Sequence, residues 1–359
     1  MQPRLTTVGR KADHIRINRD EDVQSKGIAS GFDDYHFVPI ALPEMDLADV
    51  SLATTVFGYP LDAPIFISCM TGGTAEARRI NQSLAEVAQA CRIALGLGSG
   101  RVLLEHPEVL PTFDVRPIAP DIPVFANIGA VQLNRGVTID DCRRLVDLLR
   151  ADALVLHLNA LQEALQPEGD TGFAGLLGKI EKLCRALGVP VIAKEVGWGI
   201  PPDTAGRLLS AGVAAVDVAG AGGTSWSEVE RHRLGIELRR RIAAHFAGWG
   251  IPTADAVREA HAAYPDAMIF ASGGIASGVD AAKAIALGAQ LVGVAGPFLR
   301  AAAAGVDVAL DLAQEYIETL RIVMFAIGAR SLADLRDSPR LLRSAISPCL
   351  VPSPRPEPE

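Results

Sequence analysis

The densest group of chemically capable side chains lies in the stretch HLNALQEALQPEGD, where His157, Asn159, Gln162 and Glu163 fall within seven residues. A histidine can act there as a general acid or base, with the glutamine as a neutral hydrogen-bond partner. A glutamate is a hard oxygen ligand that suits Mg²⁺. The alternative is an ordinary helix start, in which Asn159 caps the helix and Glu163 favours its dipole. We favour a functional cluster, because burying a histidine and an asparagine together without use is costly.

Two glycine-containing turns late in the chain predict a phosphate site. Ser272, Gly273 and Gly274 follow one apolar run, and Ala295 and Gly296 follow the next. Glycines let backbone N–H groups approach a phosphate, and barrels commonly bind phosphate in their last two loops, beside a helix N-terminus. Either turn alone could be an ordinary glycine turn, but the two together favour a phosphate.

Lys194 stands alone among apolar neighbours in the run VIAKEVG. It is either a rim residue or a charge aimed into a cavity, and its place at the end of a predicted strand favours the second. There it could form a Schiff base or stabilise negative charge on a flavin or phosphate. Hydrogen-bonding residues follow other predicted strands: Thr71, Ser99, Asn127 and Thr224. This set suits a phosphorylated heteroaromatic cofactor, FMN, better than a sugar phosphate.

A basic cluster near the start contains Arg10, Lys11 and His14. Most short basic runs near a terminus are simply solvated. If this segment folds over the mouth of the site, however, it could clamp a diphosphate, to which arginine binds bidentately. Arg101 follows the second predicted strand and could share that role.

Eight short apolar runs must position these residues. They lack polar alternation and end in small or polar residues, which is typical of strands buried on both faces of a parallel sheet. Helix-period segments alternate with them, so we predict a (β/α)8 barrel over a doubly wound open sheet. The runs are 63–70, 93–99, 122–130, 153–160, 189–197, 214–223, 268–275 and 291–299.

The predicted barrel spans residues 63–300. We expect residues 1–62 to form a polar N-terminal arm and residues 301–346 to form helices that pack on the barrel. Residues 347–359 are rich in proline, which cannot continue a helix, and should form a flexible tail. The long interval between the sixth and seventh runs predicts an insertion on the functional, loop-bearing side.

Composition excludes several classes of protein. With 34 Lys and Arg against 42 Asp and Glu, the net charge of −8 provides no general attraction for nucleic acid or an anionic membrane. The 49% hydrophobic and 5% aromatic content predicts a folded chain with an aliphatic core. Five scattered cysteines without a C-x-x-C pair favour a reducing cytoplasm. We find neither a secretory signal nor a membrane-spanning stretch, so we expect a soluble protein.

Taken in their order along the chain, the motifs resemble those of the type 2 isopentenyl-diphosphate isomerases, the FMN-dependent form. The likeness covers about residues 9–345 and rests on RKADH, ALPEMDL, APIFISCMTGGT, LGSGR, ANIGA, HLNALQEALQPEGD, AKEVGWGI, GAGGTSWSEVE, WGIPTA and SGGI. MTGG with H-x-N-x-x-Q-E and K-E-V-G-x-G is specific, because FMN barrels of the hydroxy-acid oxidase type carry other sequences at these strand ends.

The resemblance implies a reversible 1,3-allylic rearrangement of isopentenyl diphosphate to dimethylallyl diphosphate. It implies FMN kept reduced by NADPH or another reductant, with Mg²⁺ on the diphosphate. Since the reaction has no net redox change, reduced flavin would be the acid/base, with Gln162 and His157 in catalytic support. The family is also assembled from identical barrels, which implies a homo-oligomer, a tetramer or octamer.

Site residues are carried over position by position from the resemblance. The substrate would be bound by Arg10, Lys11, Ser99, Gly100, Arg101 and Gln162, and Mg²⁺ by Glu163. FMN would be bound by Cys69, Met70, Thr71, Ser99, Asn127, Lys194, Thr224, Gly273, Gly274, Ile275, Ala295 and Gly296.

This chain departs from the family at two positions near the expected flavin. Ala276 stands where a basic residue is frequent, and Ala219 stands where a serine is found. Both changes remove polar contacts, so we expect them to weaken FMN binding.

Two other functions stay open. An FMN oxidoreductase of the 2-hydroxy-acid type needs a histidine and arginines placed to hold a carboxylate substrate, whereas the seventh run ends only in Ser272, Gly273 and Gly274. A flavin-binding barrel kept as a sensor or scaffold is the third interpretation. Gln162 and Glu163 argue against it, because a mere binder needs no metal ligand at the mouth.

Overall fold

Eight parallel strands close into a barrel in a computed structural model, which describes residues 7–344 and, for Thr7, Val8 and Arg10, the backbone alone. Each strand pairs with the next along the chain, and the last pairs with the first, so the predicted (β/α)8 fold is confirmed. The strands are β4 (Ile65–Ile67), β5 (Ala94–Gly96), β6 (Val124–Gly129), β7 (Ala153–Leu158), β8 (Val191–Glu195), β9 (Ala215–Asp217), β10 (Ile269–Ser272) and β11 (Leu291–Val294).

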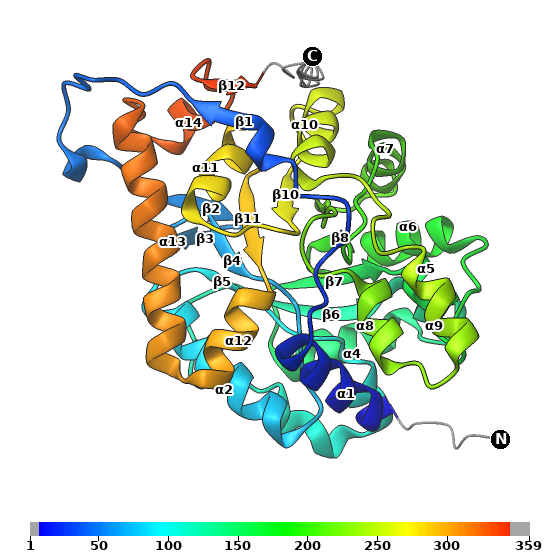
Figure 1. The fold of residues 1–359 in the computed structure, drawn as a ribbon. Helices are drawn as coiled ribbons and strands as arrows, with labels where there is room; N and C mark the ends of the chain where they lie inside the picture. Colours follow the sequence, from blue (N-terminus) through cyan, green and yellow to red (C-terminus); the bar gives the residue numbers. More distant parts are fainter. Residues whose placement is uncertain (1–6, 345–359) are drawn as a thin grey trace, which may run out of the picture.

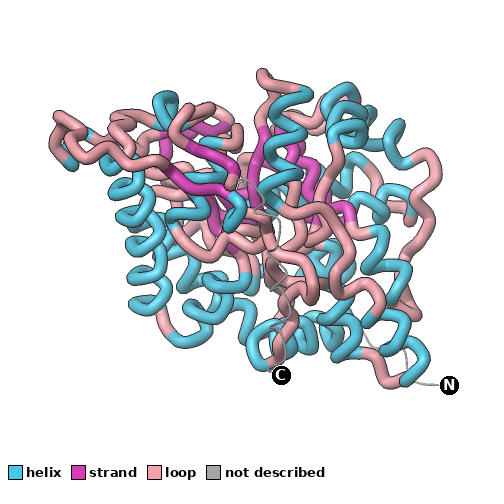
Figure 2. The backbone as a smooth tube through the Cα atoms, turned by 45° about the horizontal axis from the view of Figure 1, so that its top comes forward, coloured by secondary structure: helices cyan, strands magenta, loops and turns pink. Residues whose placement is uncertain are grey.

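Helices enclose the strands on the outside of the barrel (Figure 1; Figure 2). Local sequence sets where they begin and end: Thr138 and Asp141 form a reciprocal capping box, and Gly188 takes a φ of 85° just past a helix end. These helices are α2 (Ala75–Ala90), α3 (Arg101–Glu105), α4 (Ile139–Leu149), α5 (Ala160–Leu165), α6 (Leu176–Ala186), α7 (Pro202–Ser210), α8 (Trp226–Arg233), α9 (Glu237–Ala244), α10 (Thr253–Ala263), α11 (Gly278–Ala286) and α12 (Gly296–Ala304).

The buried core is mostly aliphatic, as the composition predicts, and a group of phenylalanines is added to it inside the barrel. Phe66, Phe125 and Phe270 belong to three strands, and the ring centroid of Phe66 lies 6.2 Å from that of Phe125 and 5.6 Å from that of Phe270. Phe57 packs against two of these rings from the turn between β2 (Thr54–Val56) and β3 (Tyr59–Leu61). Four phenylalanines thus pack together in and beneath the barrel.

Residues before the barrel pack against it in separate places. α1 (Thr7–Asp20) lies against α8 and α12, near the C-terminal ends of the strands. β1 (Tyr35–Phe37) pairs antiparallel with β12 (Leu341–Arg343), far from α1 in Figure 1.

After the barrel, α13 (Val306–Ala326) packs along α2, α11 and α12, and α14 (Leu332–Leu335) contacts α11. The boundary predicted at residue 300 falls inside α12, because the eighth barrel helix continues to Ala304. The expected tail, residues 347–359, lies outside the described residues. Within residues 7–344, no helix is long and apolar enough to cross a membrane.

Candidate functional site

The polar strand ends meet in one cavity with a volume of about 570 Å³. That volume lies within the range of small-molecule and cofactor sites, roughly 300 to 1,000 Å³. Most of the predicted site residues line it: Lys11, Cys69, Met70, Thr71, Ser99, Arg101, Asn127, His157, Gln162, Glu163, Lys194, Thr224, Gly273, Gly274, Ile275, Ala295 and Gly296.

Two predicted residues are not among those lining the cavity. Gly100 precedes α3, and a Cβ at this position would lie 2.4 Å from a methyl group of Leu145. Close packing against α4 therefore accounts for the glycine. The side chain of Arg10 lies outside the described residues.

The cluster after β7 is held together by Asn159. Its side-chain amide donates to Oε1 of Gln162 at 3.2 Å and to Oε1 of Glu163 at 2.8 Å. Asn159 occupies the N-cap position of α5, but its side chain makes no capping hydrogen bond. Its Oδ1 is buried and has no partner in the described residues. The asparagine therefore orients the glutamine and the glutamate rather than the helix backbone.

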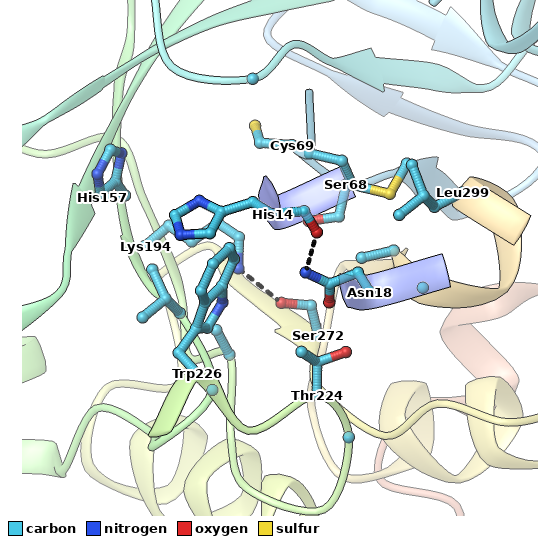
Figure 3. A pocket seen from close by; sticks show the side chains of 18 of the residues that line it. His14, Asn18, Ser68, Cys69, His157, Lys194, Thr224, Trp226, Ser272 and Leu299 are labelled. Atoms are coloured by element: carbon cyan, nitrogen blue, oxygen red, sulfur yellow. Dashed lines mark hydrogen bonds between the residues drawn. The ribbon is translucent and has the colours of Figure 1, made fainter. Parts of the chain in front are cut away.

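His157 belongs to the same wall, at the end of β7. Its Nδ1 lies 2.9 Å from Oδ1 of Asn127 on β6, within hydrogen-bond distance. A Cβ on Gly129 would lie 3.0 Å from Nε2 of His157. The ring is thus held between two strands, and Figure 3 shows it beside the cavity, opposite Trp226 and His14 from other elements.

Glu230 on α8 is a buried carboxylate behind this wall. Oε1 accepts hydrogen bonds from Nε2 of Gln162 at 3.0 Å and Nε2 of Gln166 at 2.5 Å, and lies 3.2 Å from Nε2 of His14. Oε2 accepts from Nε of Arg233 at 2.7 Å. Burial raises the pKa of Glu230, but the contacts with His14, Arg233 and Gln162 outweigh burial and lower it to about 2. Glu230 is therefore ionised and fixes the amide of Gln162.

Lys194 lies on the floor of the cavity, in contact with Ser272 and Asp217. Its ammonium donates to the carbonyl of Glu195 at 2.9 Å and to Oγ of Ser272 at 3.2 Å. It also lies 3.4 Å from Oδ2 of Asp217, whose Oδ1 accepts from Ser272 at 2.7 Å. The carboxylate of Asp217 is inaccessible to solvent. Figure 3 shows Lys194 and Ser272 joined in this way.

Cys69 is placed at the cavity by the end of β4. Burial raises the pKa of its thiol to about 11, although the ammonium of Lys194 and a hydrogen bond with Asn127 favour the thiolate. The thiol is therefore neutral at physiological pH and serves as a small lining group, not as a nucleophile.

The two glycine turns bring backbone into the cavity wall. Gly273 and Gly274 have φ values of 103° and 67°, and a Cβ on Gly273 would lie 2.1 Å from the carbonyl oxygen of Gly220. Ala295 and Gly296 begin α12, which starts at the cavity. The first turn therefore requires glycine, and the second brings the start of a helix to the cavity.

The N-terminal segment covers the mouth of the cavity. Lys11 donates from Nζ to the carbonyl of Ser99 at 2.7 Å, and Nζ lies 5.0 Å from the ring centroid of Phe113. His14 contacts Glu230 and stands edge-on to Trp226, with ring centroids 5.1 Å apart. These contacts place Lys11 and His14 over the strand ends and leave α1 anchored there.

Arg101 also lines the mouth, and its charge is met by carboxylates. Its guanidinium lies 2.9 Å from Glu105 and 3.1 Å from Asp170. Asp170 in turn pairs with Arg135 and donates its backbone N–H to Oε2 of Glu163 at 2.6 Å. Arg101 is therefore linked through Asp170 to the predicted metal ligand.

Sequence reasoning missed several residues that line or support the cavity. They lie beyond the last residues of the strands, on α1, α8, α12 and the short helix after β6 (Ala130–Asn134). A search for polar residues at strand ends could therefore not find them. They are Asn18, Gln132, Trp226, Glu230 and Arg300.

The described residues contain no group of three or more His, Cys, Asp or Glu side chains that could hold a metal ion. Glu163 is thus a lone carboxylate at the cavity, 8% exposed. Magnesium is often held by one or two carboxylates together with substrate phosphates and water, so this donor set fits a metal that arrives with a diphosphate.

A barrel with a polar cavity at its strand ends and glycine turns after the last two strands defines a cofactor-binding barrel enzyme. Residues 161–343 match the family model described as FMN-dependent dehydrogenase. A mandelate oxidase variant shares the fold, with a TM-score of 0.63 and 20% identity, over 94% of this chain and 99% of that one. A flavocytochrome b2 variant gives a TM-score of 0.67 at 18% identity, over 92% and 83% of the two chains. The family match supports FMN as the cofactor, and the two solved structures show the shared fold.

Curated relatives define the family more narrowly. The isopentenyl-diphosphate delta-isomerase of a Nostoc species is 50% identical over 94% of this chain and 96% of its own. The proteins of that name from a Synechococcus species and from Rickettsia rickettsii are 52% and 51% identical, over 93% and 91% of this chain and 96% of their own. The chain therefore belongs to the isopentenyl-diphosphate delta-isomerase family, and it is an isomerase.

Proposed function

We propose that this enzyme interconverts isopentenyl diphosphate and dimethylallyl diphosphate, with FMN in reduced form and Mg²⁺. The observation that carries the proposal is the convergence of Gln162, Glu163 and His157 with Lys194 and the two glycine turns in one cavity. The family of 50% identical relatives supports the same substrate pair.

The residues present fit FMN. Thr71, Asn127 and Lys194 offer hydrogen-bonding groups around the cavity, and the backbone at Gly273 and Gly296 is open beside α12. These residues would hold the flavin together with Cys69, Met70, Ser99, Thr224, Gly274, Ile275 and Ala295. Reduced FMN, when bound, supplies the group that exchanges a proton with the allyl unit, and NADPH is the proposed reductant.

Side chains of the protein would orient the substrate and hold in place the groups that take part in proton transfer. Lys11 and Arg101, with Arg10, Ser99 and Gly100, would bind the diphosphate, and Glu163 would hold Mg²⁺ against it. Gln162 reaches the cavity while Glu230 fixes its amide, so its direction is set before the substrate arrives. His157, whose Nδ1 lies 2.9 Å from Oδ1 of Asn127, would support proton transfer from the end of β7.

We further propose that the enzyme works in the cytoplasm as a homo-oligomer, a tetramer or octamer. The scattered cysteines with no C-x-x-C pair support a reducing compartment. Size-exclusion chromatography with light scattering would test the assembly, and a monomer would contradict it.

A direct assay separates this proposal from a 2-hydroxy-acid oxidoreductase. Purified protein with FMN, Mg²⁺ and dithionite should convert each C5 diphosphate to the other, followed by NMR. Lactate and mandelate should fail to reduce the bound flavin under anaerobic conditions. Flavin reduction by a 2-hydroxy acid without isomerisation would favour the oxidoreductase, and bound flavin with neither activity would favour a sensor or scaffold.

A further inference from the structure

Arg300 differs from the other cationic residues that line the cavity. Arg101 and Lys194 lie beside carboxylates, and Lys11 donates to the carbonyl of Ser99. Arg300 lines the same cavity from the second turn of α12 and, within residues 7–344, forms neither an ion pair nor a side-chain hydrogen bond. Arg300 is a solvent-exposed residue at the edge of the cavity, and an uncompensated guanidinium there is available to an anion.

The guanidinium lies over the start of α12. Helical side chains point back toward the N-terminus, which brings a residue in the second turn over the first. A Cβ on Gly296 would lie 3.3 Å from Nη1 of Arg300 and 3.6 Å from Oγ1 of Thr224. The backbone of Gly296, a guanidinium and a hydroxyl thus converge on one small volume.

The neighbouring helix start offers much less to an anion. At α11, Ser277 accepts the N–H of Asp280, and the carboxylate of Asp280 accepts the N–H of Ala276. An acidic side chain therefore already occupies that terminus, and Ala276 adds no donor from its side chain. The cation that faces this end of the cavity comes from α12.

Charge balance also calls for a cation at this end. A phosphate monoester carries about −1.5 to −2 charges at neutral pH. A helix N-terminus supplies only about half of one positive charge. A guanidinium beside the start of α12 would compensate most of the remainder.

We propose that Arg300 binds the phosphate group of FMN, together with the backbone at Gly296 and the hydroxyl of Thr224. This inference rests on the proposed placement of FMN in the cavity, with its phosphate beside the turns after β10 and β11. It assigns to α12 the positive charge that Ala276 does not provide.

The test compares two flavins that differ only in the phosphate. Apoprotein freed of flavin is titrated with FMN and with riboflavin, and binding is followed by flavin fluorescence. Arg300→Ala should raise the Kd for FMN at least tenfold, about 1.4 kcal/mol, and leave the Kd for riboflavin within twofold. Arg300→Lys should lie between the wild type and the alanine variant.

Arg241→Ala is the matched control, because Arg241 is an exposed arginine on α9 that does not line the cavity. It should change neither Kd. If Arg300→Ala does not fold, as judged by thermal unfolding of the apoprotein, Arg300→Gln keeps the length and removes the charge. An unchanged Kd for FMN, or an equal loss for both flavins, would overturn the proposal.

Failure of this inference can be distinguished from failure of the proposed function. A wild type that prefers FMN through Arg300 but does not isomerise would refute the function alone. An isomerising wild type whose Arg300 variants bind FMN normally would refute the role of Arg300 alone.

Discussion

The two ends of the cavity treat charge in opposite ways. At the end formed by α5 and α8, the carboxylate of Glu230 contacts Gln162, Gln166, His14 and Arg233. At the end formed by β10, β11 and α12, glycine residues line the cavity, and Arg300 has no carboxylate paired with it within the described chain. At the first end, the buried carboxylate is paired with side chains of the protein itself. The second end can accept an anion.

This difference suggests that the first end positions a reacting side chain and that the second end contributes affinity for an anionic ligand. A buried network whose central carboxylate is bonded through both oxygens holds one geometry, which suits a group that must act on a bound hydrocarbon. An uncompensated cation beside open backbone gains most when an anionic ligand arrives. Changes at the first end should therefore alter turnover or stability, and changes among the anion-binding groups should alter ligand affinity.

The largest expected effect lies at Gln162. Gln162→Ala should lower kcat at least about 100-fold, because it removes the polar group that Glu230 orients into the cavity. Flavin content should stay at the wild-type level. Steady-state kinetics and flavin absorbance measure both quantities, with Gln89→Ala on the barrel exterior as the control. A rise in KM without a change in kcat, or a loss of bound FMN, would contradict the claim that this end of the cavity acts on turnover and the other end on ligand affinity.

Glu230 should make stability depend on acidity. Its pKa is about 2 in the folded protein, against an ordinary value of 4.5. As pH falls below about 4.5, the carboxylate of Glu230 becomes protonated in the unfolded chain but stays ionised in the folded chain until about pH 2. The contribution of Glu230 to the free energy of unfolding is therefore lost progressively in that interval. Between pH 6 and 3 the wild type should lose about 2 kcal/mol more free energy of unfolding than Glu230→Gln.

Urea unfolding at the two pH values measures this difference. Glu86→Gln, at an exposed position on α2, should lose as much as the wild type. Equal acid sensitivity of the wild type and Glu230→Gln would show that Glu230 is not a paired carboxylate in the folded protein.

Glu163 should control the metal requirement. Glu163→Gln should raise the Mg²⁺ concentration for half-maximal isomerisation about tenfold, because a neutral amide is a poorer magnesium ligand. A magnesium titration of the reduced enzyme measures it, with Glu315→Gln on α13 as the control. An unchanged requirement would remove Glu163 as a ligand and leave it as the partner of Asn159.

The smallest effect is expected at the mouth. Lys11→Ala should raise KM for isopentenyl diphosphate about fivefold, about 1 kcal/mol, by removing one charged donor from the diphosphate. Flavin content should not change. Lys182→Ala, an exposed lysine on α6, is the control for lost charge. A KM equal to that of the wild type would show that Lys11 does not bind the diphosphate and that the N-terminal segment has only a structural role.

The barrel could be predicted from sequence because parallel strands buried on both faces are continuously apolar and end at one face. Lys194 and Glu163 were singled out by this rule, since Lys194 lies near the end of such a run and Glu163 follows another. Gly100 shows its limit: the glycine matches a substrate-binding position, and close packing against Leu145 on the neighbouring helix also accounts for it. Sequence likeness marks a position without saying which of its neighbours requires the residue.

Glu230 and Arg300 could not be found in this way. Glu230 lies in the strongly polar segment WSEVERHR, which suggests a solvated helix. Its burial depends on α8 packing against α5, and it bonds Gln162 across 68 residues of sequence. Arg300 belongs to the second turn of α12 and reaches the cavity because helical side chains point toward the N-terminus.

Isomerisation by the reduced enzyme tests the central claim most directly. Purified protein, reconstituted with FMN, supplied with Mg²⁺ and reduced by dithionite, is incubated with isopentenyl diphosphate in deuterated water and followed by NMR. The account predicts dimethylallyl diphosphate carrying solvent deuterium, with no net oxidation of the flavin. No conversion by the folded, flavin-loaded protein would contradict it.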